Sequence, residues 1–214
     1  MKCMVKFTVG AILCMSLTTA VAAKAICFSC RQDADSLRQF LVTLGGQSNP
    51  DVGGVLDLSE GQVRRLADGR KKQKSVDMLY AYGPKTGANL LAPSSSRLRY
   101  FGGSLYKMSY RWSDFSKGYF IDLKHSKKAA QLYAETQTLQ ELIQAYNDVL
   151  RMRKVKTGRT GLNALEMSIP HIEPGDIIIF GSYDKPGLYA IAKVVDYTSG
   201  YEGTLTLDFK VSIR

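Results

Sequence analysis

The last eleven residues of the chain, "TLTLDFKVSIR", alternate between polar and apolar side chains without exception. The apolar members are Leu205, Leu207, Phe209, Val211 and Ile213. Since successive side chains of a strand point to opposite faces of a sheet, this alternation predicts a half-buried antiparallel strand. A chain that ends this way must build a sheet and an apolar layer to cover one face of it.

Two further strands are predicted directly before this segment. The run "IIIF" (177–180) is continuously apolar, which is typical of a strand covered on both faces. "GLYAIAKVVDY" follows the turn "SYDKPG", and the turn "TSGYEG" joins it to the last strand. The last forty residues therefore predict a C-terminal β-meander.

Other stretches with period-two patterns predict strands further upstream. These are "SVDMLYAYG", with Val76, Met78, Tyr80 and Tyr82 on one face, "SLYKMSYRW", with Tyr106, Met108, Tyr110 and Trp112 on one face, and "GYFIDL", with Tyr119, Ile121 and Leu123 aligned. The intervening "GPKTGANLLAPSSS" is rich in turn-forming residues and predicts a loop.

Helical spacing is visible in two places. A substantial helix is predicted near 138–154, where Thr138 and Glu141 have the spacing of a capping box. Its apolar stripe is formed by Leu139, Leu142, Ile143, Tyr146 and Leu150. A short amphipathic helix is also predicted over 35–44, from the spacing of Leu37, Phe40, Leu41 and Leu44.

These elements predict one α+β domain over residues 24–214. It is expected to be mainly antiparallel β-sheet, sandwich- or barrel-like, with the one substantial helix and the C-terminal meander. No repeat of fixed period and no low-complexity linker divides the chain.

The first 23 residues have the features of a secretory signal peptide. Lys2 and Lys6 precede or border an apolar stretch, and small residues follow in "TTAVAAKA". Cleavage is expected after Ala22, Ala23 or Ala25; a retained anchor helix is the alternative. We therefore expect an exported protein of the periplasm or cell surface that is not an integral membrane protein.

The formal net charge is +10, and basic residues gather in "GRKKQK" (69–74) and "RMRKVKTGR" (151–159). A negatively charged partner is one interpretation: an anionic envelope glycan, a lipid or a protein. A solvated basic surface is the other. Nucleic acid is not expected, because an exported chain seldom meets it.

Cysteine and histidine usage limits the chemistry further. Cys27 and Cys30 in "CFSC" could form a disulfide in an oxidising compartment, or an exchanging redox pair at the start of a helix. The histidines, His125 and His171, show no paired ligand spacing. Neither a metal site nor a cofactor is predicted.

The segment "IEPGDIIIF" is similar to one in cell-wall cysteine peptidases, which follow it with a strand that carries a catalytic histidine. Here that strand, "GLYAIAKVV", has no histidine, and no cysteine follows Cys30. We interpret Pro174 and Gly175 as a turn and Asp176 as an acceptor for nearby amides. An acid–base cluster of His171, Glu173 and Asp176 remains the alternative, and would suit a hydrolase acting on an envelope polymer.

Aromatic side chains are the candidate binding residues. Tyr106, Tyr110 and Trp112 on one strand face could stack on sugar rings, although the same pattern also suits a buried sheet face. The same two interpretations apply to Tyr80 and Tyr82.

Several stretches together resemble domains of uncharacterised exported and surface proteins of Gram-negative bacteria. They are "VTLGGQSNPDVGGVLDLSEGQV", "SVDMLYAYGPKTGANLLAPSS", "LQELIQAYND" and the ending from "IEPGD" onward. The resemblance implies export and a sheet-rich fold, and implies no activity. The leading hypothesis is an exported, non-enzymatic binding or interaction domain; the alternative is the exported hydrolase.

Overall fold

The computed structural model describes residues 36–157 and 166–212. The chain divides into two units between Arg31 and Gln32, and every described residue lies in the second unit. The expected signal peptide and the pair Cys27 and Cys30 lie outside the described residues, so those expectations stay predictions.

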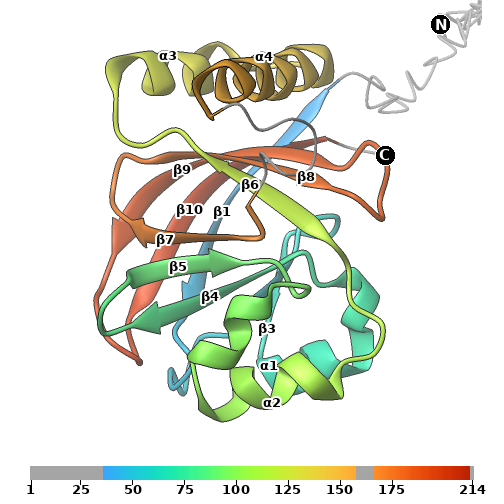
Figure 1. The fold of residues 1–214 in the computed structure, drawn as a ribbon, viewed down its shortest axis with the longest axis vertical. Coiled ribbons are helices and arrows are strands. Elements are labelled where there is room, and N and C mark those ends of the chain that lie inside the picture. Colours follow the sequence, from blue (N-terminus) through green and yellow to red (C-terminus); the bar gives the residue numbers. More distant parts are fainter. Residues whose placement is uncertain (1–35, 158–165, 213–214) are drawn as a thin grey trace, which may run out of the picture. The chain divides into compact units, whose positions relative to one another are not determined.

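Two five-stranded antiparallel sheets form this unit (Figure 1). The first sheet has the order β1-β10-β9-β8-β6, with β1 Leu37–Gly45, β6 Gly118–Asp122, β8 Ile177–Ser182, β9 Tyr189–Tyr197 and β10 Thr204–Ser212. The second has the order β3-β2-β4-β5-β7, with β2 Val55–Asp57, β3 Gln62–Arg64, β4 Met78–Gly83, β5 Gly87–Leu91 and β7 Ser168–Ile172. All paired strands are antiparallel.

The inner faces of the two sheets pack together and form the largest part of the core. Phe120, Phe180 and Phe209 of the first sheet meet Tyr80 and Leu90 of the second in one buried cluster. The α+β, mainly antiparallel prediction is therefore confirmed. Of the two forms expected, the structure is a sandwich, because the sheets do not close into a barrel.

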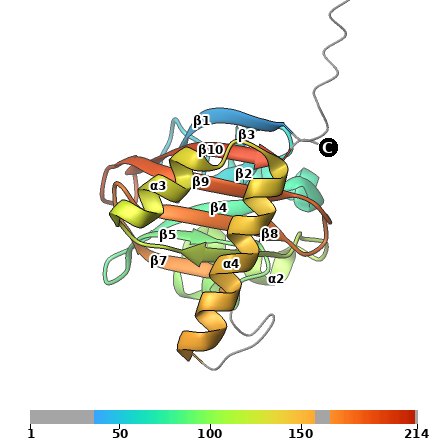
Figure 2. The same ribbon diagram turned by 90° about the horizontal axis from the view of Figure 1, so that it is seen from above.

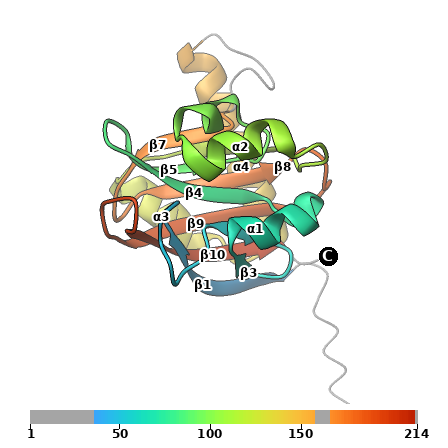
Figure 3. The same ribbon diagram turned by 90° about the horizontal axis from the view of Figure 1, so that it is seen from below.

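Helices cover both outer faces of the sandwich. The layer on the first sheet consists of α3 Lys127–Glu135 and α4 Leu139–Thr157 (Figure 2). The layer on the second sheet consists of α1 Leu66–Gly69, α2 Gly103–Arg111 and two 3₁₀ helices, η1 Arg70–Ser75 and η2 Ser96–Tyr100 (Figure 3). Each layer has its own buried apolar cluster against its sheet. None of the described helices is long and apolar enough to cross a membrane.

The C-terminal meander is confirmed as β8, β9 and β10. The apolar residues of β10 point into the inter-sheet core as predicted. The opposite face is less open than the alternation suggests, because α3 lies over one end of it. Lys210 there is only 5% exposed, and its amino group donates to the carbonyls of Tyr133 and Thr136 at the C-terminus of α3, both at 2.8 Å.

The predicted helix over 35–44 is wrong. This segment is β1, which pairs with β10 over its whole length. Phe40, Val42 and Leu44 also have period-two spacing, and they join the inter-sheet core. Leu41, which the helical pattern would bury, is 63% exposed. The nine-residue pairing with β10 decided the conformation.

The predicted strand "SLYKMSYRW" is also wrong, because this segment is α2. Leu105, Met108 and Trp112 have helical spacing and are buried against the second sheet. The strand "GYFIDL" is confirmed as β6, and "SVDMLYAYG" contains β4.

The helix predicted near 138–154 is confirmed as α4, and its capping box is present. The Glu141 amide donates to Thr138 Oγ1 at 3.2 Å, and the Thr138 amide donates to Glu141 Oε2 at 2.9 Å. The hydrogen bonds that the Gln137 and Thr138 amides donate to the Glu141 carboxylate lower the pKa of Glu141. The side of α4 that packs on the first sheet is formed by Leu142, Ala145 and Val149, so Leu142 is the member of the predicted stripe that is fully buried.

Candidate functional site

A cavity of about 540 Å³ lies between three segments that are far apart in the sequence. It is lined by the β4–β5 hairpin, by η2 and the residue after it, and by the turn between β9 and β10. The aromatic lining residues are Tyr82, Tyr100, Phe101 and Tyr201, and the other lining residues are Gly83, Pro84, Lys85, Thr86, Asn89 and Arg97. We call this the aromatic cavity.

The β4–β5 hairpin forms one wall of the aromatic cavity. Gly83 and Gly87 pair across its base, and the Thr86 amide donates to the Gly83 carbonyl at 3.1 Å. Gly87 has a φ of +60°, which an L side chain rarely adopts. The tight turn leaves Pro84 and Lys85 exposed at the cavity rim.

Gln47 lies in the loop that follows β1 and joins this loop to the β4–β5 hairpin. Its Nε2 donates to the Tyr82 carbonyl at 2.7 Å, and the Tyr82 amide donates to its Oε1 at 2.8 Å. The same loop holds the β9–β10 turn, because the Ser48 amide donates to the Tyr201 carbonyl at 3.0 Å. One loop therefore positions Tyr82 and Tyr201 together.

The rings of the cavity differ in how they are held. Tyr82 and Tyr201 meet edge to face, with centroids 5.6 Å apart. Phe101 packs on the buried cluster of the second sheet. Tyr100 is 70% exposed, and the Arg99 guanidinium lies over its ring at 4.9 Å. The cavity thus combines the contacting pair Tyr82 and Tyr201 with the largely exposed ring of Tyr100.

Two cations border these rings. Lys85 and Arg97 are both exposed and line the cavity. Among the described residues, neither forms an ion pair. Ser95 accepts from the Arg97 amide at 3.3 Å and so fixes the start of η2. The guanidinium can therefore meet an anionic group in the cavity without losing a carboxylate partner.

Asn89 is the buried polar residue of the cavity wall. Its Nδ2 donates to the carbonyls of Gly87 at 2.7 Å and Ala81 at 3.2 Å, and lies 3.0 Å from Thr86 Oγ1. Among the described residues, no donor forms a hydrogen bond with Asn89 Oδ1. This oxygen is also not one of the completely buried side-chain atoms that lack a hydrogen-bond partner. It is an available acceptor.

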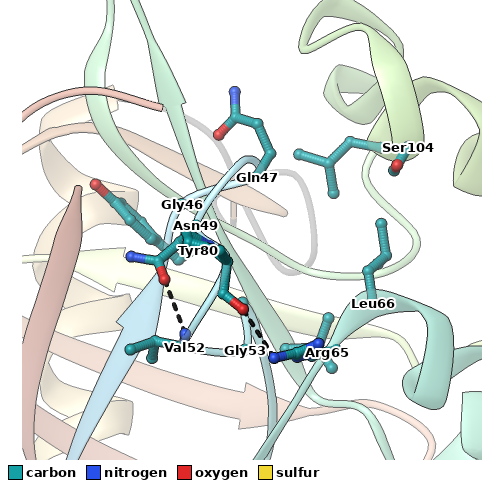
Figure 4. A pocket seen from close by; sticks show the side chains of 13 residues that line it. Gly46, Gln47, Asn49, Val52, Gly53, Arg65, Leu66, Tyr80 and Ser104 are labelled. Carbon is teal, nitrogen blue, oxygen red and sulfur yellow. Dashed lines mark hydrogen bonds between the residues drawn. The ribbon is translucent and has the colours of Figure 1, made fainter. Parts of the chain in front are cut away.

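A second cavity, of about 220 Å³, has Gln47 among its lining residues (Figure 4). Two of its polar side chains are already used within the protein: Arg65 donates to the Pro50 carbonyl at 2.8 Å, and the Val52 amide donates to Asn49 Oδ1 at 2.8 Å. The Tyr80 ring points away from Leu66 and Ser104. Its hydroxyl is buried without a partner among the described residues, and burial raises its pKa.

The three predicted aromatic binding residues are not in one place. Tyr106 and Tyr110 lie one helical turn apart on α2 and meet edge to face, with centroids 5.4 Å apart. They are 49% and 60% exposed, whereas Trp112 is 5% exposed and belongs to the buried cluster beneath α2. Tyr106 and Tyr110 are therefore an exposed pair, whereas the buried Trp112 side chain holds α2 on the second sheet. Tyr80 is in the core and Tyr82 is half-buried.

The Pro-Gly-Asp segment is a turn that the predicted residues stabilise. The Asp176 amide donates to the Glu173 carbonyl at 3.1 Å, the Glu173 amide donates to Asp176 Oδ2 at 3.1 Å, and Gly175 has a φ of +91°. Asp176 is 2% exposed, and Lys124 pairs with it at 3.1 Å.

Lys124 also pairs with Asp122 at 2.8 Å and donates to the His171 carbonyl at 2.7 Å. Burial acts to lower the pKa of Lys124, but the hydrogen bonds and charges of Asp122 and Asp176 outweigh it and raise the pKa. The carboxylate of Asp176 is thus committed to the turn and to Lys124. The hydrolase hypothesis gains no support from this arrangement.

Over residues 36–157 and 166–212, no group of three histidine, cysteine or acidic side chains is arranged to hold a metal ion. The chemistry that the described residues offer is therefore that of rings, cations and amides.

The fold defines a class, a two-sheet sandwich with helices on both outer faces. No family model matches the sequence, and no curated protein matches it. Among solved structures, the fold is similar to a DUF4466 family protein from Parabacteroides merdae, with a TM-score of 0.51 and 12% identity. The match covers 83% of this chain and 54% of that one, so the chain spans about half of that protein's length. The likeness concerns the fold alone.

Sequence reasoning missed most of the aromatic cavity. It considered Tyr82 but not Arg97, Tyr100, Phe101 or Tyr201. A usable signal exists in "RYFGG" and "SGYEG", where aromatic residues stand within glycine-containing turns that cannot bury them in a strand or helix.

Proposed function

We propose that this protein is an exported, non-enzymatic binding domain whose aromatic cavity holds one residue of an acidic saccharide. The observation that carries the proposal is the combination, in one cavity of about 540 Å³, of aromatic rings with two cations that form no ion pair among the described residues. Export rests on the signal peptide expected from the sequence.

The rings fit the faces of a sugar. Tyrosine and phenylalanine rings present apolar faces for sugar C–H groups, and tyrosine adds a hydroxyl at its rim. Tyr82 and Tyr201 are held by the Gln47 loop before any ligand arrives, which limits the ordering cost of binding. Tyr100, at 70% exposed, can adjust to the ligand.

The polar groups select for acidity. Arg97 offers a planar, two-pronged donor to a carboxylate, and Lys85 adds a second positive charge at the rim. Asn89 Oδ1 can accept from a sugar hydroxyl, since Nδ2 is already engaged with Gly87 and Ala81. A neutral sugar would use the rings but leave both cations without a ligand partner.

Titration calorimetry with oligomers of a uronic acid and with matched neutral oligomers tests the proposal. We expect the acidic oligomer to bind, and Arg97→Ala and Tyr201→Ala each to weaken binding about tenfold or more. Arg151→Ala, which removes an exposed arginine of α4 outside the cavity, serves as the matched control and should keep the affinity. Equal binding of neutral and acidic oligomers, or affinities that neither cavity variant changes, would overturn the proposal.

A further inference from the structure

The exposed side of α2 carries two kinds of side chain in adjacent rows. Tyr106 and Tyr110 form one row, and Lys107 and Arg111 form the next, each with four-residue spacing. Leu105, Met108 and Trp112 occupy the opposite, buried side. The helix is thus anchored by one face and presents aromatic and cationic side chains on the other.

Cations from η1 lie across a groove from this helix. Arg70 lines a groove of about 180 Å³ together with Lys107 and Arg111. Lys71 and Lys72 are exposed in η1 directly after Arg70. The second cavity, shown in Figure 4, shares Leu66 and Ser104 with this groove, so the two hollows adjoin. We call the surface formed by 65–74 and 103–114 the basic face.

The basic face has a large excess of positive charge. Its seven basic residues are Arg65, Arg70, Lys71, Lys72, Lys74, Lys107 and Arg111. Its acidic residues are Asp68 and Asp114, so the net charge is +5. Asp114 pairs with Lys74 at 3.1 Å, and among the described residues Arg70, Lys107 and Arg111 form no ion pair. The groove therefore concentrates cations without internal compensation.

We propose that the basic face docks the protein on an anionic phospholipid surface. Arg70, Lys107 and Arg111 contact headgroup phosphates, and the rings of Tyr106 and Tyr110 lie at the boundary between headgroups and acyl chains. Tyrosine is favoured at that boundary because it has an apolar ring and a polar tip. Clusters of lysine and arginine are attracted to anionic lipid, and this attraction acts over about one Debye length from the membrane surface.

The tyrosine pair is the reason to choose a lipid surface over an acidic polymer in water. A polymer would need only the cations, whereas the pair places two half-exposed rings beside them at the same surface. The docking is distinct from the saccharide site, since the groove and the aromatic cavity have no lining residue in common.

Co-sedimentation of the purified protein with vesicles tests this inference. The vesicles are phosphatidylcholine with or without phosphatidylglycerol, and contain no sugar. We expect binding only when phosphatidylglycerol is present, with loss at high salt. The double variant Lys107→Glu/Arg111→Glu should weaken binding about tenfold or more, and Tyr106→Ser/Tyr110→Ser should weaken it severalfold.

The matched control is Lys127→Glu/Lys128→Glu, which makes the same charge change on exposed positions of α3. It should leave vesicle binding within about twofold. Circular dichroism and thermal melting verify that each variant is folded. Three results would overturn the inference: no binding to phosphatidylglycerol vesicles, an equal loss in the control, or binding that is independent of the tyrosines and matched by polyglutamate as competitor.

Discussion

The two helical layers of the sandwich solve the same packing problem in different ways. The layer on the first sheet contains the long α4, whose first turn is closed by the Thr138–Glu141 capping box. The layer on the second sheet is built of short helices, and α2 begins at Gly102 and Gly103, with φ of +65° and +50° and no side-chain cap. The start of α4 is stabilised by local hydrogen bonds, whereas α2 is held in place by its buried side chains, Leu105, Met108 and Trp112.

The difference extends to charge and to hollow space. From Lys127 to Arg151 the first layer has three basic and three acidic residues, with further basic residues only at the far end of α4. The basic face of the second layer carries seven basic and two acidic residues over 65–74 and 103–114. The aromatic cavity and the basic groove both border the second layer, whereas the cavity of about 260 Å³ between α3 and α4 in the first layer is lined mainly by apolar side chains. The less regular layer is thus the one that combines exposed rings with uncompensated cations, which are the groups that the two proposals use.

The largest expected effect concerns the anchor of the second layer. Trp112→Ala should lower the free energy of unfolding by about 3–5 kcal/mol, because it leaves a hole in the cluster beneath α2. Urea denaturation measures this loss. Tyr110→Ala, at a position 60% exposed, should change stability by less than about 0.5 kcal/mol. Equal losses in the two variants would mean that α2 is not held as described.

The next effect concerns the first layer. Lys210→Met should destabilise the protein by about 3 kcal/mol, since the buried carbonyls of Tyr133 and Thr136 lose their donor. Thermal melting should show a fall of about 6–12 °C. Lys193→Met, on the exposed side of β9, is the control and should melt with the wild type. A stable Lys210→Met variant would contradict the role assigned to this buried lysine.

A pH effect is expected where the two sheets are joined by an ion pair. Asp77, directly before β4, pairs with Lys185 of the β8–β9 turn at 2.6 Å. Burial raises the pKa of Asp77 from 3.8 to about 6, although Lys185 and the Leu58 amide oppose the shift. The folded protein therefore binds this proton more tightly than the unfolded chain.

Since the folded pKa is the higher one, stability from this group is present below pH 3.8 and is lost as pH rises toward about 6. Relative to Asp77→Asn, the wild type should lose about 2–3 kcal/mol across that interval. Denaturation of both proteins as a function of pH measures the difference. Asp114→Asn, which changes an exposed carboxylate paired with Lys74, is the matched control. A difference curve for Asp77→Asn that does not change with pH would refute the shift.

The smallest effect sharpens the contrast in capping. Thr138→Ala should cost about 1 kcal/mol, because the Glu141 amide loses its acceptor at the start of α4. Gln140→Ala, an exposed change in the same turn, should have almost no effect. Denaturation midpoints measure both. If the two variants behave alike, the capping box does not contribute to this layer.

Much of the fold could be predicted because it depends on local patterns. The alternation of β10 and the turns around it defined the meander, and the spacing of Thr138 and Glu141 located the start of α4. The turn at Pro174 and Gly175 and the role of Asp176 followed from turn chemistry. Each of these depends on residues within a few positions of one another.

The segment "GPKTGANLLAPSSS", predicted to be a loop, contains β5, which pairs with β4 and β7. The other two errors occurred where two periodicities coexist in one short segment. Residues 37–45 show helical spacing in Leu37, Phe40, Leu41 and Leu44, and strand spacing in Phe40, Val42 and Leu44. The segment of α2 is equally ambiguous, since Met108 and Trp112 fit both patterns. Pairing with β10 decided the first case, and packing on the second sheet decided the other.

The aromatic cavity lay beyond such reasoning for a different reason. Its rings come from the β4–β5 hairpin, from η2 and Phe101 after it, and from the β9–β10 turn, and the loop of Gln47 brings two of these segments together. No local pattern links Tyr82 to Tyr201 across more than a hundred residues.

By itself, the sequence determined the antiparallel meander, the capped helix and the Pro-Gly-Asp turn, because each depends on residues close together in the chain. The excess of positive charge follows from composition alone. Only the tertiary structure decided that Trp112 is an anchor while Tyr106 and Tyr110 remain exposed, that Lys210 is buried, and that the cavity exists. The burial of a side chain, and the meeting of distant segments in a cavity, depend on how the whole core packs. No local sequence pattern specifies that packing.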